Sequence, residues 1–333
     1  MTETMTAWQR ETYGPAAGTA PAEIPVPAAG HGEVVIRVRA TALNAGDRHI
    51  MHGDPLLVRP ASGMGRPKQP VRGMDVAGTV TAVGSGVVSA EVGEEVVGEL
   101  SGFGGGLATF AVAPAGRLVP RPPGVAPALA ASLPIAAGTA WQALDLAGIG
   151  LDDDPAPRVL ILGASGGVGT FAVQLAALRG AEVWASSGER SAPLLSRLGA
   201  VRTLDHRQTP LSGLPKGHFH AVLDIAGGMP LRQLQRLLAP GGQVVLVGGE
   251  GGRVLGPIPR MLAAAVLSIG SRRRIRMFTA SAHPEILQKL LALVDEGDLV
   301  PVIEREYPFA EASVALAHLE AGHVVGKVVV HGA

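Results

Sequence analysis

Residues 158–169 read RVLILGASGGVG and join a short apolar run to a glycine-rich turn. The first five residues are typical of a strand that is buried on both faces of a sheet. After the turn, apolar side chains recur on one side of a helix that Gly180 closes; they are Val168, Phe171, Leu175 and Leu178. A strand, a glycine turn and a helix in this order predict a dinucleotide-binding unit.

The glycines of this turn have separate expected roles. Gly166 lets the backbone approach a pyrophosphate, and Gly169 lets the helix pack against the strand. The phosphates are expected at the helix N-terminus, where unpaired N–H groups and the helix dipole favour negative charge. Ala164 stands where the usual pattern has its first glycine, so the match is imperfect. We predict cofactor contacts at four residues of the turn, Ser165, Gly166, Gly167 and Val168.

The same letters also fit a second pattern, G-x-S-x-G, with Ser165 at its centre. That pattern marks the nucleophile of an α/β-hydrolase, which also lies between a strand and a helix. A triad would then need a later Asp and His, and Asp224 with His283 or His318 could supply them. This interpretation needs neither Gly169 nor a second βαβ unit, and it leaves the N-terminal strands unexplained. A tight turn without any ligand is the third interpretation.

Strand and helix patterns alternate on both sides of the turn, over a middle zone of residues 122–270. Further strands are predicted at 182–185, 201–204, 221–225 and 244–247, and helices at 190–198 and 231–238. This alternation predicts a parallel, doubly wound sheet of the Rossmann type.

The end of the second predicted strand indicates which nicotinamide cofactor is used. Units that bind NAD place an acidic residue there, about 20 residues after the glycines, to bind the ribose 2′-hydroxyl. This chain has Ser186-Ser187-Gly188-Glu189-Arg190 instead. Two hydroxyls and a guanidinium suit a 2′-phosphate, whereas a carboxylate would repel it. Glu189 lies beyond the predicted strand end, where it would not face the phosphate. We therefore predict NADPH, with the 2′-phosphate held by Ser186, Ser187 and Arg190. The alternative for Arg190 is an ordinary exposed residue at the start of a helix.

The flanking zones have a different character. Strands separated by glycine turns are predicted at 34–40, 77–83 and 95–100, which suggests a small antiparallel barrel. The C-terminal part combines a helix at 283–294, strands at 299–305 and 327–330, and a helix at about 309–321. We expect this tail to fold back onto the N-terminal zone. The predicted domains are therefore residues 1–121 with 271–333, and residues 122–270.

Composition narrows the class of protein further. The 28 basic residues balance the 28 acidic ones, so no nucleic-acid partner is expected. The absence of cysteine forbids disulfides and thiolate-bound zinc. Residues 261–270 form the most membrane-like stretch, which is too short to span a bilayer, and residues 1–14 lack a signal pattern. We expect a cytoplasmic protein without a membrane partner. The basic run 272–276 is interpreted as a solvated helix end or loop, with a phosphate-contacting lid as the alternative.

Several segments together resemble one family. They are ATALNAGD at 40–47, GMDVAG at 73–78, LPIAAGTA at 133–140, the glycine turn, LAPGG at 238–242, and the tail at 322–330 with Gly326-Lys327. The chain is similar to the zinc-independent quinone oxidoreductase-like branch of the medium-chain dehydrogenase/reductase superfamily. The resemblance implies a GroES-like β-barrel catalytic domain with an inserted Rossmann domain, a homodimer, and NADPH-dependent reduction of quinones, enones or similar activated double bonds.

The resemblance also implies further site residues. Thr139, Gly248 and Gly249 would border the nicotinamide, and His206 would lie near the adenine. Asn44 and Asp47 would lie where the N-terminal domain faces the reacting ring. We predict His49, which stands where the family often has tyrosine, as the proton donor or as a donor to the substrate oxygen. The alternatives are a pocket-wall histidine for His49 and a turn cap for Asp47.

No metal is expected. Where zinc-dependent relatives have their ligands, this chain has Asn44, Met74 and Leu133, a set that cannot make the usual zinc site. The pair His49 and His52 lacks a third ligand in the sequence.

Three functions stay open on the sequence. The first is an NADPH-dependent reductase of a small apolar carbonyl or quinone. The second is an NADPH-binding redox sensor with little turnover. The third is a non-redox biosynthetic enzyme on the same fold.

Overall fold

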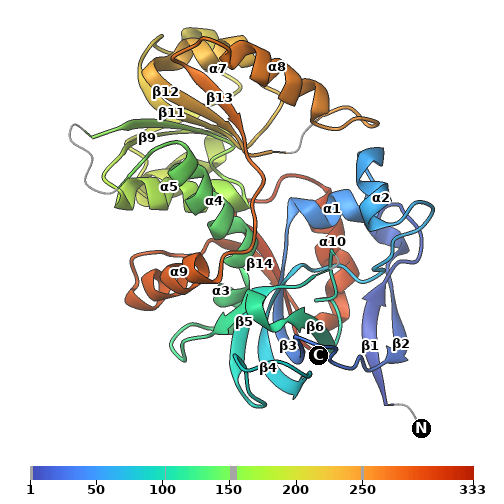
Figure 1. Cartoon of the computed structure of the whole chain (residues 1–333). Helices are drawn as coiled ribbons and strands as arrows, with labels where there is room; N and C mark the ends of the chain where they lie inside the picture. The colour runs from blue at the N-terminus through green and yellow to red at the C-terminus, as the bar shows by residue number, and fades with distance from the viewer. Residues whose placement is uncertain (1–2, 102, 151–155, 249–250) are drawn as a thin grey trace. The chain divides into compact units, whose positions relative to one another are not determined.

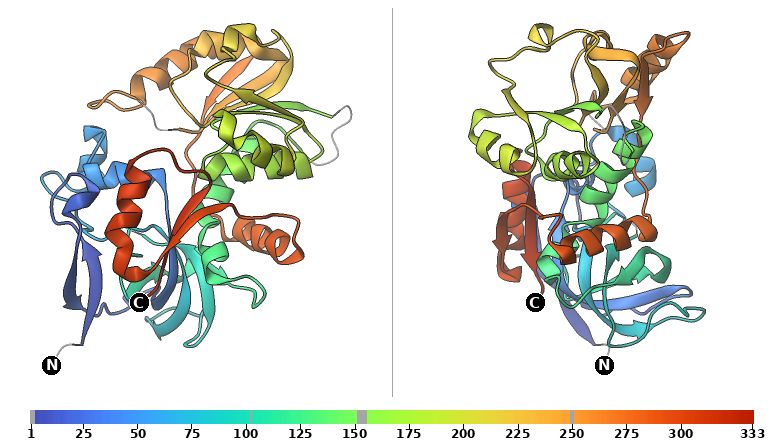
Figure 2. Two further views of the ribbon diagram at one scale, coloured as in Figure 1. Left: turned by 180° about the vertical axis from the view of Figure 1, so that it is seen from behind. Right: turned by 90° about the vertical axis from the view of Figure 1, so that its left-hand side faces the viewer.

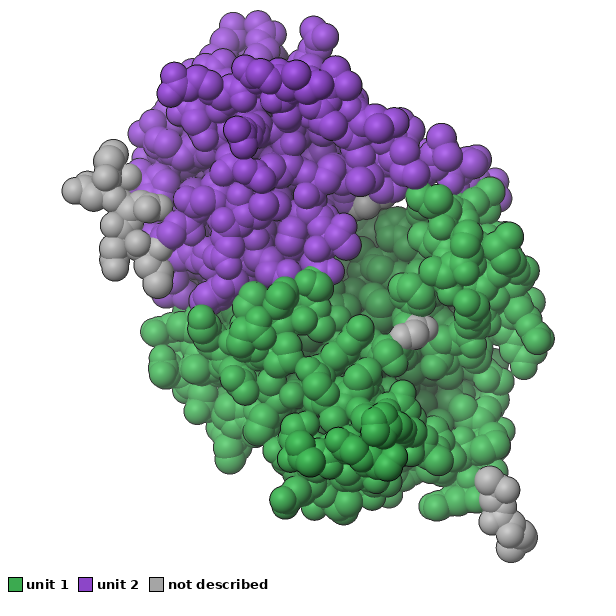
Figure 3. Space-filling view, in the orientation of Figure 1, with its two compact units in different colours: residues 1–138, 281–333 green, residues 139–280 purple. Residues whose placement is uncertain are grey.

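The computed structural model describes residues 3–101, 103–150, 156–248 and 251–333, which fall into two compact units (Figure 3). Unit 1 comprises residues 1–138 and 281–333, and unit 2 comprises residues 139–280. The N-terminal part and the C-terminal tail therefore form one unit, and the middle of the chain forms the other.

Unit 1 is built around a mostly antiparallel sheet with the strand order β14-β15-β3-β4-β5-β7, and β6 also pairs with β3. Its strands are β3 (Glu33–Leu43), β4 (Asp75–Val83), β5 (Glu95–Glu99), β6 (Phe110–Pro114), β7 (Leu118–Pro120), β14 (Ile303–Tyr307) and β15 (Lys327–His331). β1 (Thr4–Gln9) and β2 (Ala20–Pro25) form a separate antiparallel pair. Helices α1 (Ala45–His52), α2 (Arg59–Ser62), α3 (Pro127–Ala131), α9 (Pro284–Glu296) and α10 (Ala312–Glu320) complete the unit (Figure 1).

The residue pattern of β3 explains its central place in this sheet. Its first half alternates, with Ile36 and Val38 buried and Arg37 and Arg39 exposed, so one face packs on the core and the other meets water. β15 pairs with the second half of β3 along Ala40–Leu43, which places the C-terminal tail beside an N-terminal strand. The predicted return of the tail to the N-terminal zone is therefore observed.

Among the described residues of unit 2, six parallel strands form a sheet in the order β10-β9-β8-β11-β12-β13. They are β8 (Arg158–Leu162), β9 (Glu182–Ser187), β10 (Arg202–Asp205), β11 (Phe219–Asp224), β12 (Leu238–Leu246) and β13 (Arg274–Met277). Helices α5 (Gly167–Leu178) and α6 (Ala192–Arg197) follow β8 and β9, while α7 (Leu231–Leu237) precedes β12 and α8 (Ile258–Ser268) precedes β13. In Figures 1 and 2, α5 lies on one face of the sheet and α7 and α8 lie on the other. In chain order this is the 3-2-1-4-5-6 arrangement of the Rossmann fold.

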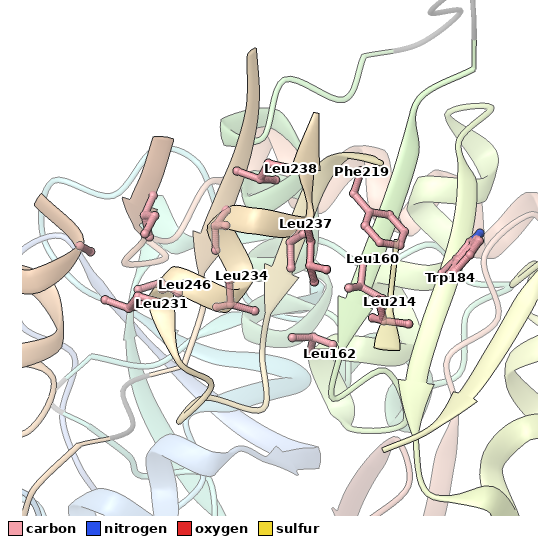
Figure 4. Close-up of a cluster of buried hydrophobic side chains, with 14 of the residues drawn as sticks. Leu160, Leu162, Trp184, Leu214, Phe219, Leu231, Leu234, Leu237, Leu238 and Leu246 are labelled. Atoms are coloured by element: carbon pink, nitrogen blue, oxygen red, sulfur yellow. The ribbon is translucent and has the colours of Figure 1, made fainter. Parts of the chain in front are cut away.

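The core of unit 2 lies between the sheet and its helices. Leu160, Phe219 and Val222 from the strands and Leu234 from α7 are fully buried in one cluster (Figure 4). Trp184 of β9 packs edge-on against Phe219, with ring centroids 5.2 Å apart. Burial of these large apolar side chains stabilises the sheet by about 1.5–3 kcal/mol for each.

Only the start of the basic run forms the predicted helix end or loop, because Arg272 and Arg273 lie in a bend between α8 and the next strand. Arg274–Met277 is strand β13, which pairs in parallel with β12 at the end of the sheet. Arg274 is exposed and Ile275 is buried, which is strand alternation over a run too short to be recognised in the sequence. Its backbone is anchored from α8, because Ser268 Oγ accepts the Ile275 N–H at 2.9 Å.

The units divide after Gly138 and after Ala280, whereas the predicted boundaries follow Arg121 and Gly270. Two contacts account for the difference. Helix α3 packs on β3, β4 and β5 of unit 1, and β13 completes the sheet of unit 2. Over the part of the chain that the structure describes, no helix has the length and apolar character needed to cross a membrane.

Candidate functional site

The predicted phosphate-binding turn follows β8 and is anchored to the neighbouring strand β9. Gly163 has a φ of +81°, a conformation that favours glycine. The N–H groups of Gly163 and Ala164 both donate to the carbonyl oxygen of Ser186, at 3.1 and 3.0 Å. Helix α5 starts at Gly167, so its first N–H groups, which have no acceptor within the helix, lie at the end of the turn.

The space around each glycine of the turn shows whether contacts within the chain exclude a side chain there or leave room for a ligand. A Cβ on Gly169 would lie 2.2 Å from the Gly163 carbonyl oxygen, and a Cβ on Gly163 would lie 2.8 Å from the Ala226 nitrogen. These two glycines are therefore required by close contacts within the chain. A Cβ on Gly166 would meet nothing closer than 3.6 Å, and its φ is −76°. The chain itself does not require glycine at position 166, which fits the predicted approach of a ligand there.

The turn lies at the point where the strand order reverses. β8 has β9 on one side and β11 on the other, so the chain leaves β8 and β11 toward opposite faces of the sheet. Open α/β sheets bind ligands at such switch points, beyond the carboxyl ends of the strands. Ser165, Gly166, Gly167 and Val168 are all partly exposed there.

The end of β9 carries hydroxyls rather than a carboxylate. Ser186 and Ser187 are buried, and the Ser187 hydroxyl donates to the Gly188 carbonyl at 3.1 Å. Glu189 and Arg190 follow in an exposed turn of 3-10 helix, so the first acidic side chain lies beyond the strand. His206, exposed just after β10, contacts the same strand end: its N–H and its Nδ1 lie 3.0 and 2.8 Å from the Ser187 carbonyl oxygen. The structure therefore brings the predicted site residues Ser187 and His206 together.

Two further predicted residues lie elsewhere in unit 2. Thr139 is buried on α4 (Pro134–Leu146), the helix at the unit boundary. Gly248 is partly exposed, shortly after the end of β12. Gly249 lies outside the described residues.

In unit 1, a buried polar cluster joins the ends of three neighbouring strands. Asn44 follows β3, Asp75 begins β4 and Lys327 begins β15. Lys327 Nζ donates to Asn44 Oδ1 at 2.5 Å, and Asn44 Nδ2 donates to Asp75 Oδ2 at 2.9 Å. The Lys327 ammonium lies 3.8 Å from Asp75 Oδ2, with 2% of the lysine side chain and none of the aspartate side chain exposed.

Burial has opposite effects on the two charged groups of this cluster. It raises the pKa of the Asp75 carboxyl to about 8, against the opposing effects of Lys327 and Asn44. It also lowers the pKa of the Lys327 ammonium, although Asp75 and Asp47 oppose the shift. The Asp75 carboxyl and the Lys327 amine therefore compete for one proton.

The predicted site residue Asp47 lies next to this cluster and caps the start of α1. Its Oδ2 accepts the Asn44 N–H at 2.9 Å, and its Oδ1 accepts the Gly73 N–H at 2.8 Å. Burial raises the pKa of the Asp47 carboxyl, while these N–H groups and the charges of Arg72 and Lys327 lower it. Both oxygens already bind the chain, which favours the capping role over direct contact with a substrate.

His49 has one ring nitrogen engaged. Its Nδ1 lies 3.0 Å from the Asp54 carbonyl oxygen, which can only accept, so Nδ1 carries the proton. In the neutral ring Nε2 is then an acceptor, and only the imidazolium can donate a proton from it. His52 pairs instead with Glu320, at 2.6 Å. Among the described residues no group of three or more His, Asp or Glu side chains is placed to hold a metal ion.

The residues proposed for a hydrolase triad are bound elsewhere. The Asp224 carboxylate pairs with Arg260 at 2.7 Å and accepts the Gly227 N–H at 3.1 Å. His318 contacts Tyr307 and Glu304 through its two ring nitrogens, and those of His283 contact Ser281 and Glu285. The geometry therefore gives no support to a nucleophilic Ser165.

Two family models match the chain. The model for the alcohol dehydrogenase GroES-like domain matches residues 30–123, and the model described as zinc-binding dehydrogenase matches residues 198–330. Among curated proteins, the chloroplast envelope quinone oxidoreductase homolog of Arabidopsis thaliana is 37% identical over 98% of each chain. The chain belongs to the quinone oxidoreductase-like branch of the medium-chain dehydrogenase/reductase superfamily. The predicted family, the α/β class with a GroES-like and a Rossmann part, and the oxidoreductase class are thus confirmed.

Other relatives carry related names. The 2-methylene-furan-3-one reductase of Solanum lycopersicum is 31% identical, over 98% of this chain and 79% of that protein. The mitochondrial NAD(P)H oxidoreductase RTN4IP1 of Danio rerio is 31% identical, over 90% of this chain and 83% of that protein. Among solved structures, the quinone oxidoreductase from Coxiella burnetii superimposes with a TM-score of 0.87 at 27% identity, over 99% of this chain and all of that one.

One of the matching family models is described as a zinc-binding dehydrogenase, but the side chains of this chain do not fit a zinc ion. The resemblance would place zinc ligands at three positions of this chain, and the first of them, Leu133, is fully buried and has no ligand atom in its side chain. Met74 offers a thioether, and both amide atoms of Asn44 already bind Lys327 and Asp75. This donor set is unsuited to a catalytic zinc, which needs three N, O or S ligands from the protein.

Proposed function

We propose that this chain is a zinc-independent, NADPH-dependent reductase that transfers a hydride to a quinone, an enone or a similar activated double bond. The observation that carries the choice of cofactor is the end of β9, where buried serines replace the expected carboxylate and Arg190 follows on the surface. The relatives named for NAD(P)H and for quinone or furanone reduction support the reaction class.

The residues of unit 2 fit a nicotinamide dinucleotide. The open space at Gly166 and the N–H groups at the start of α5 suit a pyrophosphate. Ser186, Ser187 and Arg190 would hold the 2′-phosphate, and His206 would lie beside it. Thr139, Gly248 and Gly249 would border the nicotinamide. When bound, NADPH supplies the hydride for the reaction.

The chain has to position the acceptor and stabilise the negative charge that develops on its oxygen. His49 is the proposed proton source, and it can donate from Nε2 only as the imidazolium, since its Nδ1–H is used by Asp54. The expected acceptor is a small apolar carbonyl compound or quinone.

A homodimer in the cytoplasm completes the proposal. Helix α8 exposes Leu262 and Val266, and Ile269, the residue directly after the helix, is 80% exposed. In the sheet formed by the described residues, β13 is an end strand with one unpaired edge. Such apolar surface beside an open strand edge suits a second copy of the chain. Some relatives are named for the chloroplast envelope or for mitochondria, and cell fractionation would test the cytoplasmic location proposed for this chain.

The test compares NADPH with NADH in binding and in oxidation with a panel of quinones and enones. We expect tighter binding and faster oxidation of NADPH. Arg190→Ala should weaken NADPH binding about tenfold, the value of one charge-assisted hydrogen bond, and leave NADH unchanged. Arg197→Ala, an exposed arginine on the following helix α6, is the matched control and should change neither.

The other functions give different results in the same assay. Tight NADPH binding without oxidation by any acceptor would favour a redox sensor. Absence of binding of either cofactor would refute the proposal and favour the non-redox enzyme.

A further inference from the structure

A chain of hydrogen bonds joins a serine, a histidine and a glutamate at the start of α9. The segment Ser281-Ala282-His283-Pro284-Glu285 leads into this helix in unit 1 (Figure 1). Ser281 Oγ lies 2.9 Å from His283 Nε2, and His283 Nδ1 lies 2.8 Å from Glu285 Oε1. A hydroxyl, an imidazole and a carboxylate joined in this order are the parts of a nucleophilic triad.

The local sequence explains how these three side chains come into contact. Pro284 is the first residue of α9, and a proline disfavours helical backbone in the residue before it. His283 accordingly has an extended backbone, with a φ of −130° and a ψ of 94°. Alternate residues of an extended segment point to the same side, which brings Ser281 beside His283. Glu285 lies in the first helical turn, where the helix dipole favours its negative charge.

The partners of His283 determine the direction of both hydrogen bonds. Hydrogen bonds from its own backbone N–H and from the His283 ring lower the pKa of the Glu285 carboxyl, which is therefore ionised at neutral pH. A carboxylate can only accept, so Nδ1 of the ring carries a proton. In the neutral ring Nε2 is then an acceptor, and the Ser281 hydroxyl donates to it. In this arrangement the histidine can take the serine proton while the serine oxygen attacks a substrate.

Nearby carboxylates favour the imidazolium that forms when His283 takes this proton. Glu285 is in direct contact with the ring, and Lys289 on the same helix also lowers the pKa of its carboxyl. Burial raises the pKa of the Glu99 carboxyl on β5, and the charges of Arg117 and His283 lower it. In their ionised forms, Glu99 and Glu285 would therefore both stabilise a positive charge on the ring.

The start of α9 offers no comparable support to the acyl oxygen of a substrate. Pro284 has no N–H, and the N–H groups of Ile286 and Leu287 both donate to the His283 carbonyl oxygen at 3.0 Å. The N–H of Glu285 is used by its own carboxylate. An oxygen that becomes negative during attack would therefore be stabilised by water. This restricts the reaction to acyl donors with a weakly basic leaving group.

We propose that Ser281, His283 and Glu285 form a second reactive site, which transfers acyl groups from activated esters to the Ser281 hydroxyl and then to water. All three residues are exposed, so an ester in solution can reach the serine. Ser281 and His283 are the catalytic residues, and Glu285 is a positioning residue that holds the ring. The activity is independent of the function proposed above and needs no cofactor.

The reaction has two steps. In the first, Ser281 Oγ forms a bond to the acyl carbon while its proton passes to His283 Nε2. The ester C–O bond breaks, the leaving group departs with the electron pair of that bond, and the imidazolium returns the proton to the leaving group or to water. In the second step, water attacks the acyl-serine with His283 as the base, which releases the carboxylic acid and restores the serine.

The test exposes the natural protein to 4-nitrophenyl acetate near neutral pH. Mass spectrometry after an acid quench measures acetylation of each serine-containing peptide, and absorbance measures release of 4-nitrophenol. Ser85 is a control in the same molecule: its Oγ lies 3.3 Å from His31 Nδ1, and His31 forms no ion pair with a carboxylate among the described residues. General-base catalysis typically contributes about 100- to 10,000-fold, and in this exposed site we expect Ser281 to react at least about tenfold faster than Ser85.

Variants separate the parts of the site, and all of them change exposed side chains that the core does not need. Ser281→Ala should remove the acetylated peptide and most of the 4-nitrophenol release. His283→Phe should slow acetylation of Ser281 to the rate of Ser85. Glu285→Gln should slow it about tenfold, as expected for one weakened hydrogen bond. Glu296→Gln changes an exposed carboxylate at the other end of α9 and should have no effect.

A spectroscopic measurement tests the positioning role of Glu285. A glutamine amide can either accept from Nδ1 or donate to it, so it no longer fixes the proton on that nitrogen. The 15N NMR signals of the His283 ring, assigned by their loss in His283→Phe, should therefore shift in Glu285→Gln and stay unchanged in Glu296→Gln.

Three results would overturn the proposal. Equal acetylation of Ser281 and Ser85 would show that the histidine and carboxylate do not activate the serine. Acetylation of Ser281 that is unchanged in His283→Phe would show that the three residues only order the start of α9. Undiminished 4-nitrophenol release from Ser281→Ala would place the reaction at another residue.

Discussion

Substituting Gly169 by alanine tests the packing of α5 against the end of β8. Two effects oppose each other. Alanine favours a helix over glycine by about 1 kcal/mol. The new Cβ, however, would lie 2.2 Å from the Gly163 carbonyl oxygen and 2.6 Å from the Ala164 carbonyl carbon. Both are backbone atoms of one turn, so no side chain can rotate to make room.

The clash should outweigh the helix preference. Overpacking of this kind costs about 1–3 kcal/mol, and an immobile backbone places it at the upper end. The expected net loss is about 2 kcal/mol, which corresponds to a fall of about 4–8 °C in the unfolding temperature of a unit of this size. Thermal and urea unfolding followed by tryptophan fluorescence would measure it, since two of the three tryptophans, Trp141 and Trp184, lie in unit 2.

Gly166→Ala is the matched control in the same turn. Its Cβ would have no neighbour closer than 3.6 Å, so stability should change by less than about 0.5 kcal/mol. NADPH binding should weaken about tenfold, because the added methyl fills the space proposed for the pyrophosphate. Equal stability of the Gly169→Ala variant and the natural protein would refute the packing argument, and unchanged NADPH binding in Gly166→Ala would refute the ligand role.

Three further predictions concern the ion pairs Glu95–Arg121 and Asp224–Arg260 and the effect of a metal chelator. Burial works against the ionised form of Glu95, but hydrogen bonds from Arg121 and Thr79 outweigh it and lower the pKa of its carboxyl. Its stabilising contribution is therefore fully present above its ordinary pKa of 4.5 and lost as the pH falls through the lowered pKa of the folded state. Glu95→Gln should therefore destabilise the protein in urea unfolding at pH 7, and this effect should disappear once the pH lies below that lowered pKa. Arg260→Met should cost about 3 kcal/mol by leaving the buried Asp224 carboxylate unpaired, and Arg260→Met/Asp224→Asn should recover part of that loss. Dialysis against a chelator should leave NADPH oxidation unchanged; a loss that zinc restores would contradict the argument from the donor set.

The sequence predicted the parallel sheet well because its strands are continuous apolar runs closed by glycines. Residues 158–162 were predicted as a strand and are strand β8, and the predicted strand at 182–185 is the first part of β9. β13 was missed because its four residues include two arginines, and only pairing with β12 makes them a strand. Tertiary pairing of this kind leaves almost no local signal.

Only part of the candidate site could be predicted from the sequence. The glycine turn and the serines after it are local patterns with a known chemical use. Lys327 and Asn44 are separated by 283 positions, and their contact exists only because β15 pairs with β3. The signal in the sequence was a single lysine at the start of the apolar run KVVV, an unusual residue to bury.

The anchoring of the glycine turn to β9 has a consequence for redesign of the enzyme. The Ser186 carbonyl holds the turn through two backbone N–H groups, and a carbonyl is present whatever side chain residue 186 carries. Likewise, the Ser187 carbonyl receives His206 independently of the serine hydroxyl. Under the proposed function, the side chains that would select between NADPH and NADH can therefore be exchanged without changing the backbone contacts of the glycine turn. We expect an acidic substitution at Ser187 to reverse cofactor preference while the geometry of the turn stays intact, so that selectivity and fold can be engineered separately in this protein.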